Sequence, residues 1–256
     1  MQANFYAVPG IPDIKAGDDI VELILSALAR NGKYLESGDI LVIAHKIVSK
    51  AENRFINFAD INPSREAIDL AQKVRKDPRK VEIILRESKR VIRAVDRSGL
   101  EEGILITEHK RGYISANACI DESNIEEENT ALLLPLDPDA SACNLRNSLE
   151  KKSGLKPIGV VISDTFGRAW RIGQVNVAIG LAGVPAAHHL LDTSDAYGNR
   201  LRVTQPAFAD EITAASGLLM KKEGKCPVIV FKGLDWEPAD NKATDLIRPE
   251  KEDLFR

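Results

Sequence analysis

The chain has 256 residues, and at roughly 150 residues per domain this length predicts one or two domains. Hydrophobic residues make up 44% and charged residues 29%, while 17 glycines and 12 prolines are ordinary numbers; this excludes disordered and collagen-like chains. The 35 Lys and Arg residues against 38 Asp and Glu residues give a formal net charge of −3. No overall positive field favours nucleic acid or an anionic membrane as a partner, so we expect any anion site to be local.

The cysteines and the uncharged stretches point to an ordinary intracellular enzyme. Cys119, Cys143 and Cys226 are far apart and form no CxxC pair, so we expect reduced thiols. The first residues lack a basic segment followed by a long apolar stretch, so no secretory signal is predicted and the cytoplasm is the default location. The uncharged run at residues 172–191 contains polar side chains and a proline, and its apolar centre is too short to span a membrane.

Helical and strand-like segments alternate along the chain. Apolar periodicity and capping residues predict helices at residues 18–31, 64–76, 78–92, 139–152 and 208–222. Short apolar runs predict strands at residues 39–44, 103–107, 112–115, 132–134, 157–162 and 227–231. No repeat of fixed period and no low-complexity linker interrupts them. We expect a mixed α/β (α+β) fold, with residues 1–256 forming one catalytic unit whose lobe boundaries the sequence leaves open.

The usual phosphate-binding and hydrolase motifs do not occur. The sequence contains neither GxGxxG nor GxxxxGK[ST], so neither a Rossmann nor a P-loop fold is expected. Candidate site residues instead follow apolar strands, where open α/β sheets bind ligands. Asp164 and Thr165 end the strand at 157–162, and Asp121 lies in a polar loop. Their oxygens suit Mg²⁺ or Mn²⁺, but Asp164 could instead cap a turn or a helix, and Asp121 could be a solvated carboxylate.

Basic residues follow the strand at residues 39–44. Lys46 and Lys50 share one face if Lys46 begins a helical turn, and two ammonium groups there suit phosphate, although a solvated lysine face is the alternative. His45 could hydrogen-bond a base or be an ordinary surface histidine. After Asp164, the segment GRAWRIGQ at residues 167–174 carries Arg168, Trp170 and Arg171. These residues could bind an anion and stack a planar group, or Trp170 could be core with the arginines capping helices.

Five ordered stretches resemble one family, the coenzyme F-420 gamma-glutamyl ligases, which add L-glutamate to the terminal carboxylate of F-420-0. The stretches are VPGIP with KAGDD (residues 8–12 and 15–19), GDILVIAHKIVSKAE (38–52), SANACIDESN (115–124), SDTFGR (163–168) and DAYG (195–198). The resemblance implies a homodimer of intertwined α/β subunits with an unusual, two-lobed fold. It also implies that GTP with Mg²⁺ or Mn²⁺ drives an acyl-phosphate route, with two metal sites and K⁺ as a further candidate ion.

The resemblance also implies roles for individual residues. It places the divalent metal on Asp121, Asp164 and Thr165, and the acceptor near Arg168, Trp170 and Arg171. Its nucleotide-binding positions are Ile11, Pro12, Asp13, Ile14, His45, Lys46, Lys50, Asn124, Met220, Lys221, Lys222, Glu223 and Gly224. The chain differs from the family pattern at three places: Asn53 replaces a glycine, Ala169 replaces a proline, and Met220 is followed by Lys221 instead of glycine.

The sequence therefore predicts a ligase that makes an amide bond, with F-420-0, L-glutamate and GTP as substrates and no protein nucleophile. Phosphoryl transfer to a carboxylate depends mainly on positioning and charge neutralisation, which metal-bound aspartates and lysines supply. An amide ligase acting on another acid remains an alternative. A nucleotide- or metal-binding module without turnover is a second alternative, motivated by the altered segment from Met220 to Gly224.

Overall fold

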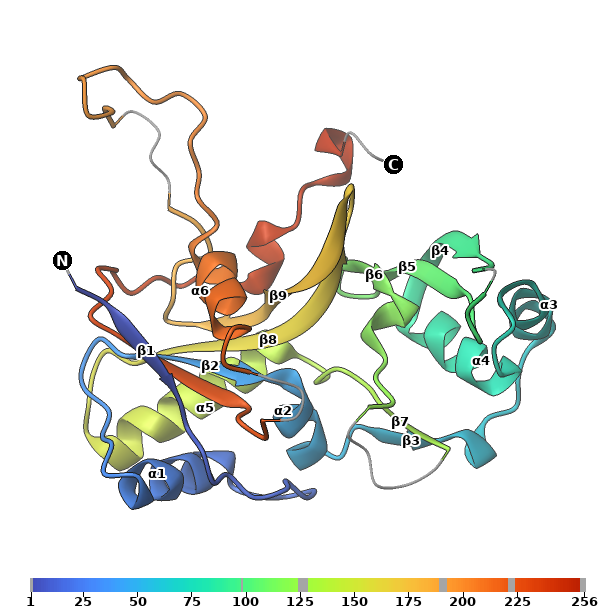
Figure 1. The fold of residues 1–256 in the computed structure, drawn as a ribbon, viewed down its shortest axis with the longest axis horizontal. Coiled ribbons are helices and arrows are strands. Elements are labelled where there is room, and N and C mark those ends of the chain that lie inside the picture. Colours follow the sequence, from blue (N-terminus) through green and yellow to red (C-terminus); the bar gives the residue numbers. More distant parts are fainter. Residues whose placement is uncertain (1, 98, 124–128, 189–192, 221–223, 254–256) are drawn as a thin grey trace.

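The computed structural model describes residues 2–97, 99–123, 129–188, 193–220 and 224–253. Figure 1 shows helices packed on a central sheet, with a smaller group of elements to one side. The α-helices are α1 (Ile20–Arg30), α2 (His45–Ala51), α3 (Arg65–Val74), α4 (Pro78–Glu87), α5 (Pro138–Ser153) and α6 (Phe208–Ser216). The strands are β1 (Asn4–Ala7), β2 (Ile40–Ala44), β3 (Phe55–Asn57), β4 (Ser88–Val95), β5 (Ile104–His109), β6 (Ile114–Ala116), β7 (Thr130–Leu132), β8 (Gly159–Arg168), β9 (Arg171–Ala182) and β10 (Val228–Lys232).

The central sheet has the strand order β1-β10-β2-β8-β9. Among the described strand pairs of this sheet, β2 and β8 are parallel and the others antiparallel, and Ala44 pairs with Ser163 at the carboxyl ends of β2 and β8. One core packs α1, α2 and α5 on one face of this sheet, and a second core packs α6 on the other. Leu41 and Ile43 enter the first core, while Ile40 and Val42 enter the second. The continuous apolar run of β2 follows from this two-sided burial.

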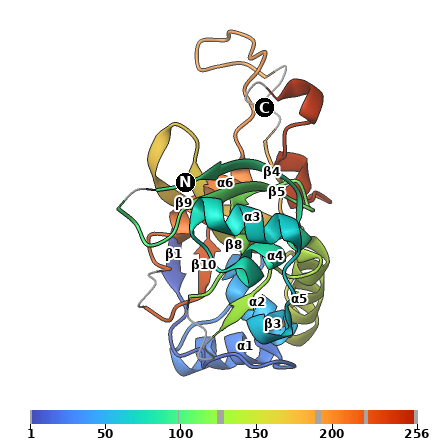
Figure 2. The same cartoon turned by 90° about the vertical axis from the view of Figure 1, so that its right-hand side faces the viewer.

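A smaller lobe lies beside the sheet. Helices α3 and α4 pack on a three-stranded antiparallel sheet of order β4-β5-β6, as Figure 2 shows from its side. The lobe has its own core, built from Ala67, Ala71, Val74, Val81, Ile84, Leu105 and Ala118. The short β3–β7 pair lies between this lobe and α2. The mixed α/β fold class is confirmed.

Several predicted elements have different limits in the structure. The helix expected at 78–92 ends at Glu87, because the following residues form β4 and pair with β5. The helix expected at 208–222 ends at Ser216, and the strand expected at 132–134 is β7, ending at Leu132. The first helix is capped by the Asp19 side chain, whereas Asp18 accepts a hydrogen bond from the Lys15 amide.

The uncharged run that begins at residue 172 continues as a strand. It forms most of β9, which makes a long antiparallel hairpin with β8. Among the described residues, no helix is long and apolar enough to cross a membrane. All three cysteines are free thiols, as predicted: Cys119 is buried, Cys226 half-buried and Cys143 exposed.

Candidate active site

The candidate site lies at one end of the central sheet, where β2 and β8 finish side by side. His45 begins α2 directly after β2, and Asp164 follows the last buried residues of β8. Because the two strands are parallel neighbours, these residues meet: His45 Nε2 lies 3.2 Å from Asp164 Oδ1. His45 is 2% exposed, and its Nε2 makes no hydrogen bond with any described residue. The contact with Asp164 is therefore close but poorly aligned.

Lys46, the next residue along α2, contacts the Asp121 loop. Its Nζ lies 2.7 Å from Asp121 Oδ2 and donates a hydrogen bond of 2.6 Å to Ser123 Oγ. The Ser123 amide and hydroxyl both donate to Asp121 Oδ1. Burial raises the pKa of Asp121, but the hydrogen bonds from Lys46 and Ser123 outweigh it, so this pKa lies below its usual value. Asp121 is thus held as a carboxylate.

The backbone around Asp121 is fixed on both sides. Asp121 exchanges two backbone hydrogen bonds with Leu132, of 3.1 and 2.8 Å. Just before it, three consecutive residues, Asn117, Ala118 and Cys119, have positive φ angles of 53°, 52° and 59°. A left-handed backbone costs a non-glycine residue roughly 1–2 kcal/mol, so this turn stores strain next to the site. The strained turn directs the chain from β6 toward the end of β8.

A buried thiol, that of Cys119, lies near the Asp164 carboxylate. Cys119 Sγ is 2.9 Å from Ser115 Oγ. Burial, reinforced by the nearby charge of Asp164, raises the pKa of the Cys119 thiol well above its usual value. Cys119 is therefore a neutral thiol at neutral pH. It fills space beside Asp164 and does not act as a thiolate.

Thr165 and Met220 approach the site from the other face of the sheet. Neighbouring side chains of a strand point to opposite faces, so Thr165 and Asp164 point apart. Thr165 Oγ1 lies 2.9 Å from Asn176 Oδ1 on β9. The Asn176 amide donates to Met220 Sδ at 3.7 Å, and Ser163 Oγ donates to the same sulfur at 3.9 Å. Met220 is thereby placed against the end of β8.

The segment from Ile11 to Ile14 offers less side-chain surface than the sequence indicates. Ile11 and Ile14 are 7% and 5% exposed and belong to the core, whereas Pro12 and Asp13 are exposed. Asp13 Oδ2 lies 3.8 Å from Lys225 Nζ, which places this segment beside the chain that follows Gly224. Asn124, Lys221, Lys222 and Glu223 lie outside the described residues.

Lys50 occupies the last turn of α2, one turn after Lys46. It is half-buried, and within the described part of the chain it has no hydrogen bond or ion pair. Asn53, just after the helix, has a φ of 54°. This left-handed position explains why glycine suits it and why asparagine, which tolerates the region, can replace it.

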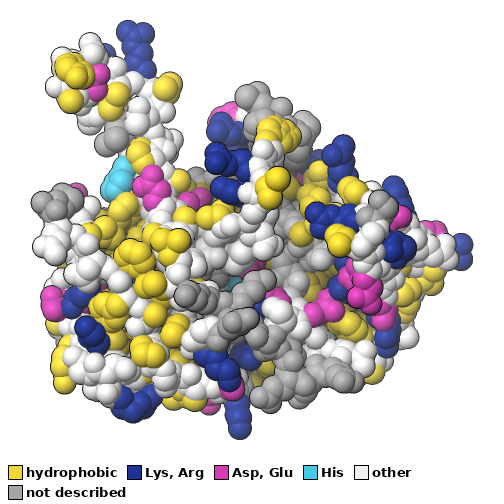
Figure 3. Space-filling model, viewed as in Figure 1, with side chains coloured by type: hydrophobic (Ala, Val, Ile, Leu, Met, Phe, Trp, Pro, Cys, Tyr) yellow, Lys and Arg dark blue, Asp and Glu magenta, His cyan; other side chains and the backbone are white. Residues whose placement is uncertain are grey.

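Arg168, Trp170 and Arg171 lie at the tip of the β8–β9 hairpin. Trp170 is 76% exposed, so the core alternative for this residue is wrong, and no helix is present for the arginines to cap. The Arg168 guanidinium donates to the Ile172 carbonyl at 2.8 Å and fixes the tip. Arg168 lies four residues beyond Asp164, about 13 Å along the strand. On the face in Figure 3, Lys and Arg side chains gather beside the hairpin tip and the C-terminal segment.

The described residues contain no group of three or more His, Cys, Asp or Glu side chains that could hold a metal ion. Four residues that the sequence analysis names as candidates form two close pairs in the structure, His45 with Asp164 and Lys46 with Asp121. The sequence did not single out Ser123 or Asn176 as hydrogen-bond partners of candidate residues. The pairing of Asn176 with Thr165 depends on the register of β9, for which the sequence carries no signal.

Comparison with known proteins shows which family the chain belongs to. The sequence profile described as "F420-0:Gamma-glutamyl ligase" matches residues 10–233. The chain is 40% identical over 259 residues to the coenzyme F420:L-glutamate ligase of Methanothermobacter thermautotrophicus, covering 100% of both chains. It is 40% identical over 223 residues to the same-named protein of Methanocaldococcus jannaschii, covering 87% of this chain and 86% of the relative. For that of Archaeoglobus fulgidus the identity is 38% over 257 residues, covering 100% and 97%. The chain therefore belongs to the F420-0:gamma-glutamyl ligase family.

Proposed function

We propose that this protein joins L-glutamate to the terminal carboxylate of F-420-0, using GTP and an acyl-phosphate intermediate. The observation that carries the proposal is that two aspartates at the end of β2 and β8 each lie against a residue of α2, Asp164 against His45 and Asp121 against Lys46. The printed names of the relatives, coenzyme F420:L-glutamate ligase, support glutamate and an F420-type acceptor as substrates.

The donor atoms at this end of the sheet fit Mg²⁺ or Mn²⁺ brought in with a nucleotide. Mg²⁺ is commonly held by one or two carboxylates plus substrate phosphates and water, so a dedicated cluster of three protein ligands is not required. Asp121 and Asp164 supply such carboxylates. Beside Asp164, the buried His45 Nε2 atom has no hydrogen-bond partner among the described residues, so a ligand could supply one. Thr165 points to the other face of β8, so we assign it to a second ion.

The nucleotide would lie between α2, the segment at residues 11–14 and Met220. Lys50 has an ammonium group without a partner among the described residues, and it can contact phosphate without losing an existing bond. Lys46 already neutralises Asp121, so a metal ion at Asp121 would free this ammonium for phosphate. Charge-assisted hydrogen bonds of this kind are among the strongest that side chains make.

The proposed reaction needs no nucleophilic side chain from the protein. A carboxylate oxygen of the acceptor attacks the γ-phosphorus of GTP, and GDP leaves. The amine nitrogen of glutamate then attacks the acyl carbon, the C–O bond to phosphate breaks, and the nitrogen loses its proton. A bound divalent ion would neutralise charge on the transferred phosphoryl group. The lysines hold the phosphates in line with the attacking oxygen, and Arg168, Trp170 and Arg171 contact the acceptor.

We also propose that the protein acts as a homodimer. The β8–β9 hairpin extends away from the main body, and Ile172 at its tip is fully exposed. A large aliphatic side chain at the end of a projecting hairpin is stabilised when a second copy covers it. Sedimentation equilibrium tests this: a dimer is expected for the native chain and weaker association for Ile172→Ser.

The proposed reaction is tested by incubating the protein with GTP, Mn²⁺, F-420-0 and L-glutamate and analysing the products by mass. An increase of one glutamyl residue, with release of phosphate, is the expected result, and it should be lost with Asp164→Asn. GTP binding without phosphate release would instead identify a nucleotide-binding module. Phosphate release only with a different acid would identify an amide ligase with another acceptor.

A further inference from the structure

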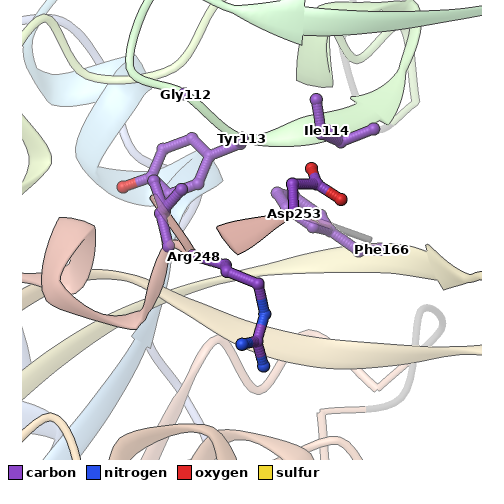
Figure 4. A pocket seen from close by; sticks show the side chains of 7 residues that line it. Gly112, Tyr113, Ile114, Phe166, Arg248 and Asp253 are labelled. Atoms are coloured by element: carbon purple, nitrogen blue, oxygen red, sulfur yellow. The ribbon is translucent and has the colours of Figure 1, made fainter. Parts of the chain in front are cut away.

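A small apolar pocket lies next to the candidate active site. It has a volume of about 270 Å³ and is lined by Gly112, Tyr113, Ile114, Phe166, Ile247, Arg248 and Asp253. Figure 4 shows how Tyr113 and Ile114 from the small lobe, Phe166 from β8, and Arg248 and Asp253 from the C-terminal segment surround the opening. The walls thus come from three parts of the chain that are distant in sequence.

The position of Phe166 joins this pocket to the site. Phe166 follows Asp164 by two residues on β8, so both side chains leave the strand on the same face. Two residues of extended strand span about 7 Å. A ligand that fills the pocket therefore has one end within reach of Asp164, at the end of β8.

The pocket walls suit a flat aromatic ring. The rings of Tyr113 and Phe166 meet edge to face, with centroids 6.0 Å apart and an interplanar angle of 70°. Tyr113 donates its hydroxyl hydrogen to the Ile179 carbonyl at 2.7 Å, and burial raises the pKa of this phenol. Its ring is therefore a neutral, fixed wall. A third aromatic ring, from a ligand, can pack against such a pair by offset stacking or by edge-to-face contact.

The glycine in the wall brings the small lobe against the C-terminal segment. Gly112 has a φ of +91° and closes the turn with a hydrogen bond from its amide to the His109 carbonyl. A Cβ atom at this position would lie 3.2 Å from Ile247 Cδ1. The close approach of the backbone to Ile247 closes one side of the pocket.

The rim of the pocket carries charged side chains. Arg248 is exposed and presents a guanidinium group, and Asp253 adds a carboxylate to the same lining. Arg168 projects from the same strand as Phe166, two residues further along. Guanidinium groups bind carboxylate and phosphate oxygens and also stack on planar rings. The apolar walls suit a planar aromatic ring, and the guanidinium groups of Arg248 and Arg168 suit an anionic group attached to it.

We propose that this pocket binds the ring-bearing part of the acid acceptor and leaves its terminal carboxylate beside the divalent ion that Asp164 would hold. The assignment rests on the proposed ligase function for its acceptor, F-420-0. A pocket of this size holds only part of a ligand, since whole ligand sites commonly measure about 300–1,000 Å³. The remainder of the acceptor would lie along β8, between the pocket and the phosphoryl group.

The test is equilibrium dialysis of F-420-0 against the native protein and two variants, alongside the product-mass assay. Ile114→Trp fills the pocket, and Arg248→Ala removes the rim cation. Each should raise the dissociation constant of F-420-0 about tenfold or more, with GTP affinity unchanged. The matched controls are Ile92→Trp and Arg93→Ala. Ile92 is 37% exposed against 38% for Ile114, and it lies on β4, away from the pocket.

The outcomes separate this assignment from the proposed function. If the native protein makes product but Ile114→Trp and Arg248→Ala bind F-420-0 normally, the pocket assignment is wrong and the ligase function stands. If F-420-0 binds only with the pocket intact but no product forms, the pocket is correct and the ligase function is wrong. If F-420-0 does not bind the native protein, both are wrong. Conversion of a dimer to a monomer by Ile114→Trp would show that the pocket is a subunit interface, which overturns the assignment.

Discussion

His45 and Asp164 lie 3.2 Å apart although they come from opposite halves of the chain. The contact exists because β2 and β8 are parallel neighbours, so that Ala44 pairs with Ser163 and the next residue of each strand continues into the site. Parallel strands bring their carboxyl ends to one edge of the sheet, which is where ligands bind in open α/β folds. In this protein a buried histidine and a carboxylate meet at that edge.

Replacing either carboxylate should abolish turnover without unfolding the protein. Asp164→Asn and Asp121→Asn keep the side-chain shape but remove the charge that would hold the proposed divalent ion. Loss of several kcal/mol of charge stabilisation corresponds to at least about a hundredfold in kcat. Initial rates at limiting Mn²⁺ measure this, with the exposed Asp235→Asn as control. Near-native rates in either variant would remove that residue from the metal site.

The two lysines of α2 should differ in their effects. Lys50→Ala should weaken GTP binding with little change in melting temperature, because Lys50 has no partner among the described residues. Lys46→Ala should weaken binding and also lower stability, because it leaves the half-buried Asp121 without its cation. Calorimetric titration with GTP and thermal unfolding measure both, with Lys151→Ala as control. Unchanged GTP affinity in both lysine variants would mean that they form only a solvated face.

The hairpin arginines should act on the acceptor. Arg171→Lys should lower kcat/KM for F-420-0 by about ten- to a hundredfold, as expected from loss of a charge-assisted hydrogen bond, with the KM for GTP little changed. Arg168→Lys should also loosen the hairpin tip, because Arg168 donates to the Ile172 carbonyl. Steady-state kinetics and melting temperatures on the same preparations separate the two effects. A loss of stability alone would argue against acceptor binding.

Cys119 should resist alkylation while the protein is folded. Burial and Asp164 raise its pKa, so the reactive thiolate does not form near neutral pH. Because the folded pKa lies above the unfolded one, the stability linked to this thiol is present below the unfolded pKa and declines as the pH rises above it. Peptide mass analysis after iodoacetamide treatment at pH 8 should show modified Cys143 and unmodified Cys119. Rapid modification of Cys119 would contradict its burial.

Asn53 offers a test of backbone strain that does not involve the site. Its φ of 54° suits glycine, so Asn53→Gly should leave stability unchanged or raise it slightly. A β-branched residue has no such tolerance, and Asn53→Val should destabilise by about 1–2 kcal/mol. Thermal unfolding of both variants measures the difference. Equal melting temperatures would mean that α2 ends without a left-handed residue.

The sequence is sufficient to predict the strands that form the site, but it does not predict the limits of every helix and strand. The apolar runs of β2 and β8 are unambiguous because both faces are buried, and the residues after them could be assigned to a strand end. The change from helix to strand at Ser88 could not be predicted from the sequence, because pairing with β5 overrides the helical pattern of the preceding turns. The apolar stretch after Arg171 was likewise not assigned as a strand, because its pairing with β8 is non-local.

The same distinction holds for individual site residues. The sequence placed Asp164 and His45 at strand ends, and the parallel register then brought them together. The approach of Asp121 to Lys46 depends on the strained turn at Asn117, Ala118 and Cys119, and three left-handed residues in a row cannot be predicted from propensity. The aromatic pocket beside Phe166 joins three distant segments, so only the fold reveals it.

The most direct test of the central claim, phosphoryl transfer from GTP to a carboxylate at the end of β2 and β8, follows oxygen atoms. F-420-0 labelled with ¹⁸O in its terminal carboxylate is incubated with the protein, GTP, Mn²⁺ and L-glutamate in unlabelled water, and the released phosphate is analysed by mass. Through an acyl phosphate, one carboxylate oxygen leaves with the phosphorus, so phosphate carrying one ¹⁸O is predicted. Amide product accompanied by unlabelled phosphate would contradict the account, because GTP would then have been hydrolysed by water.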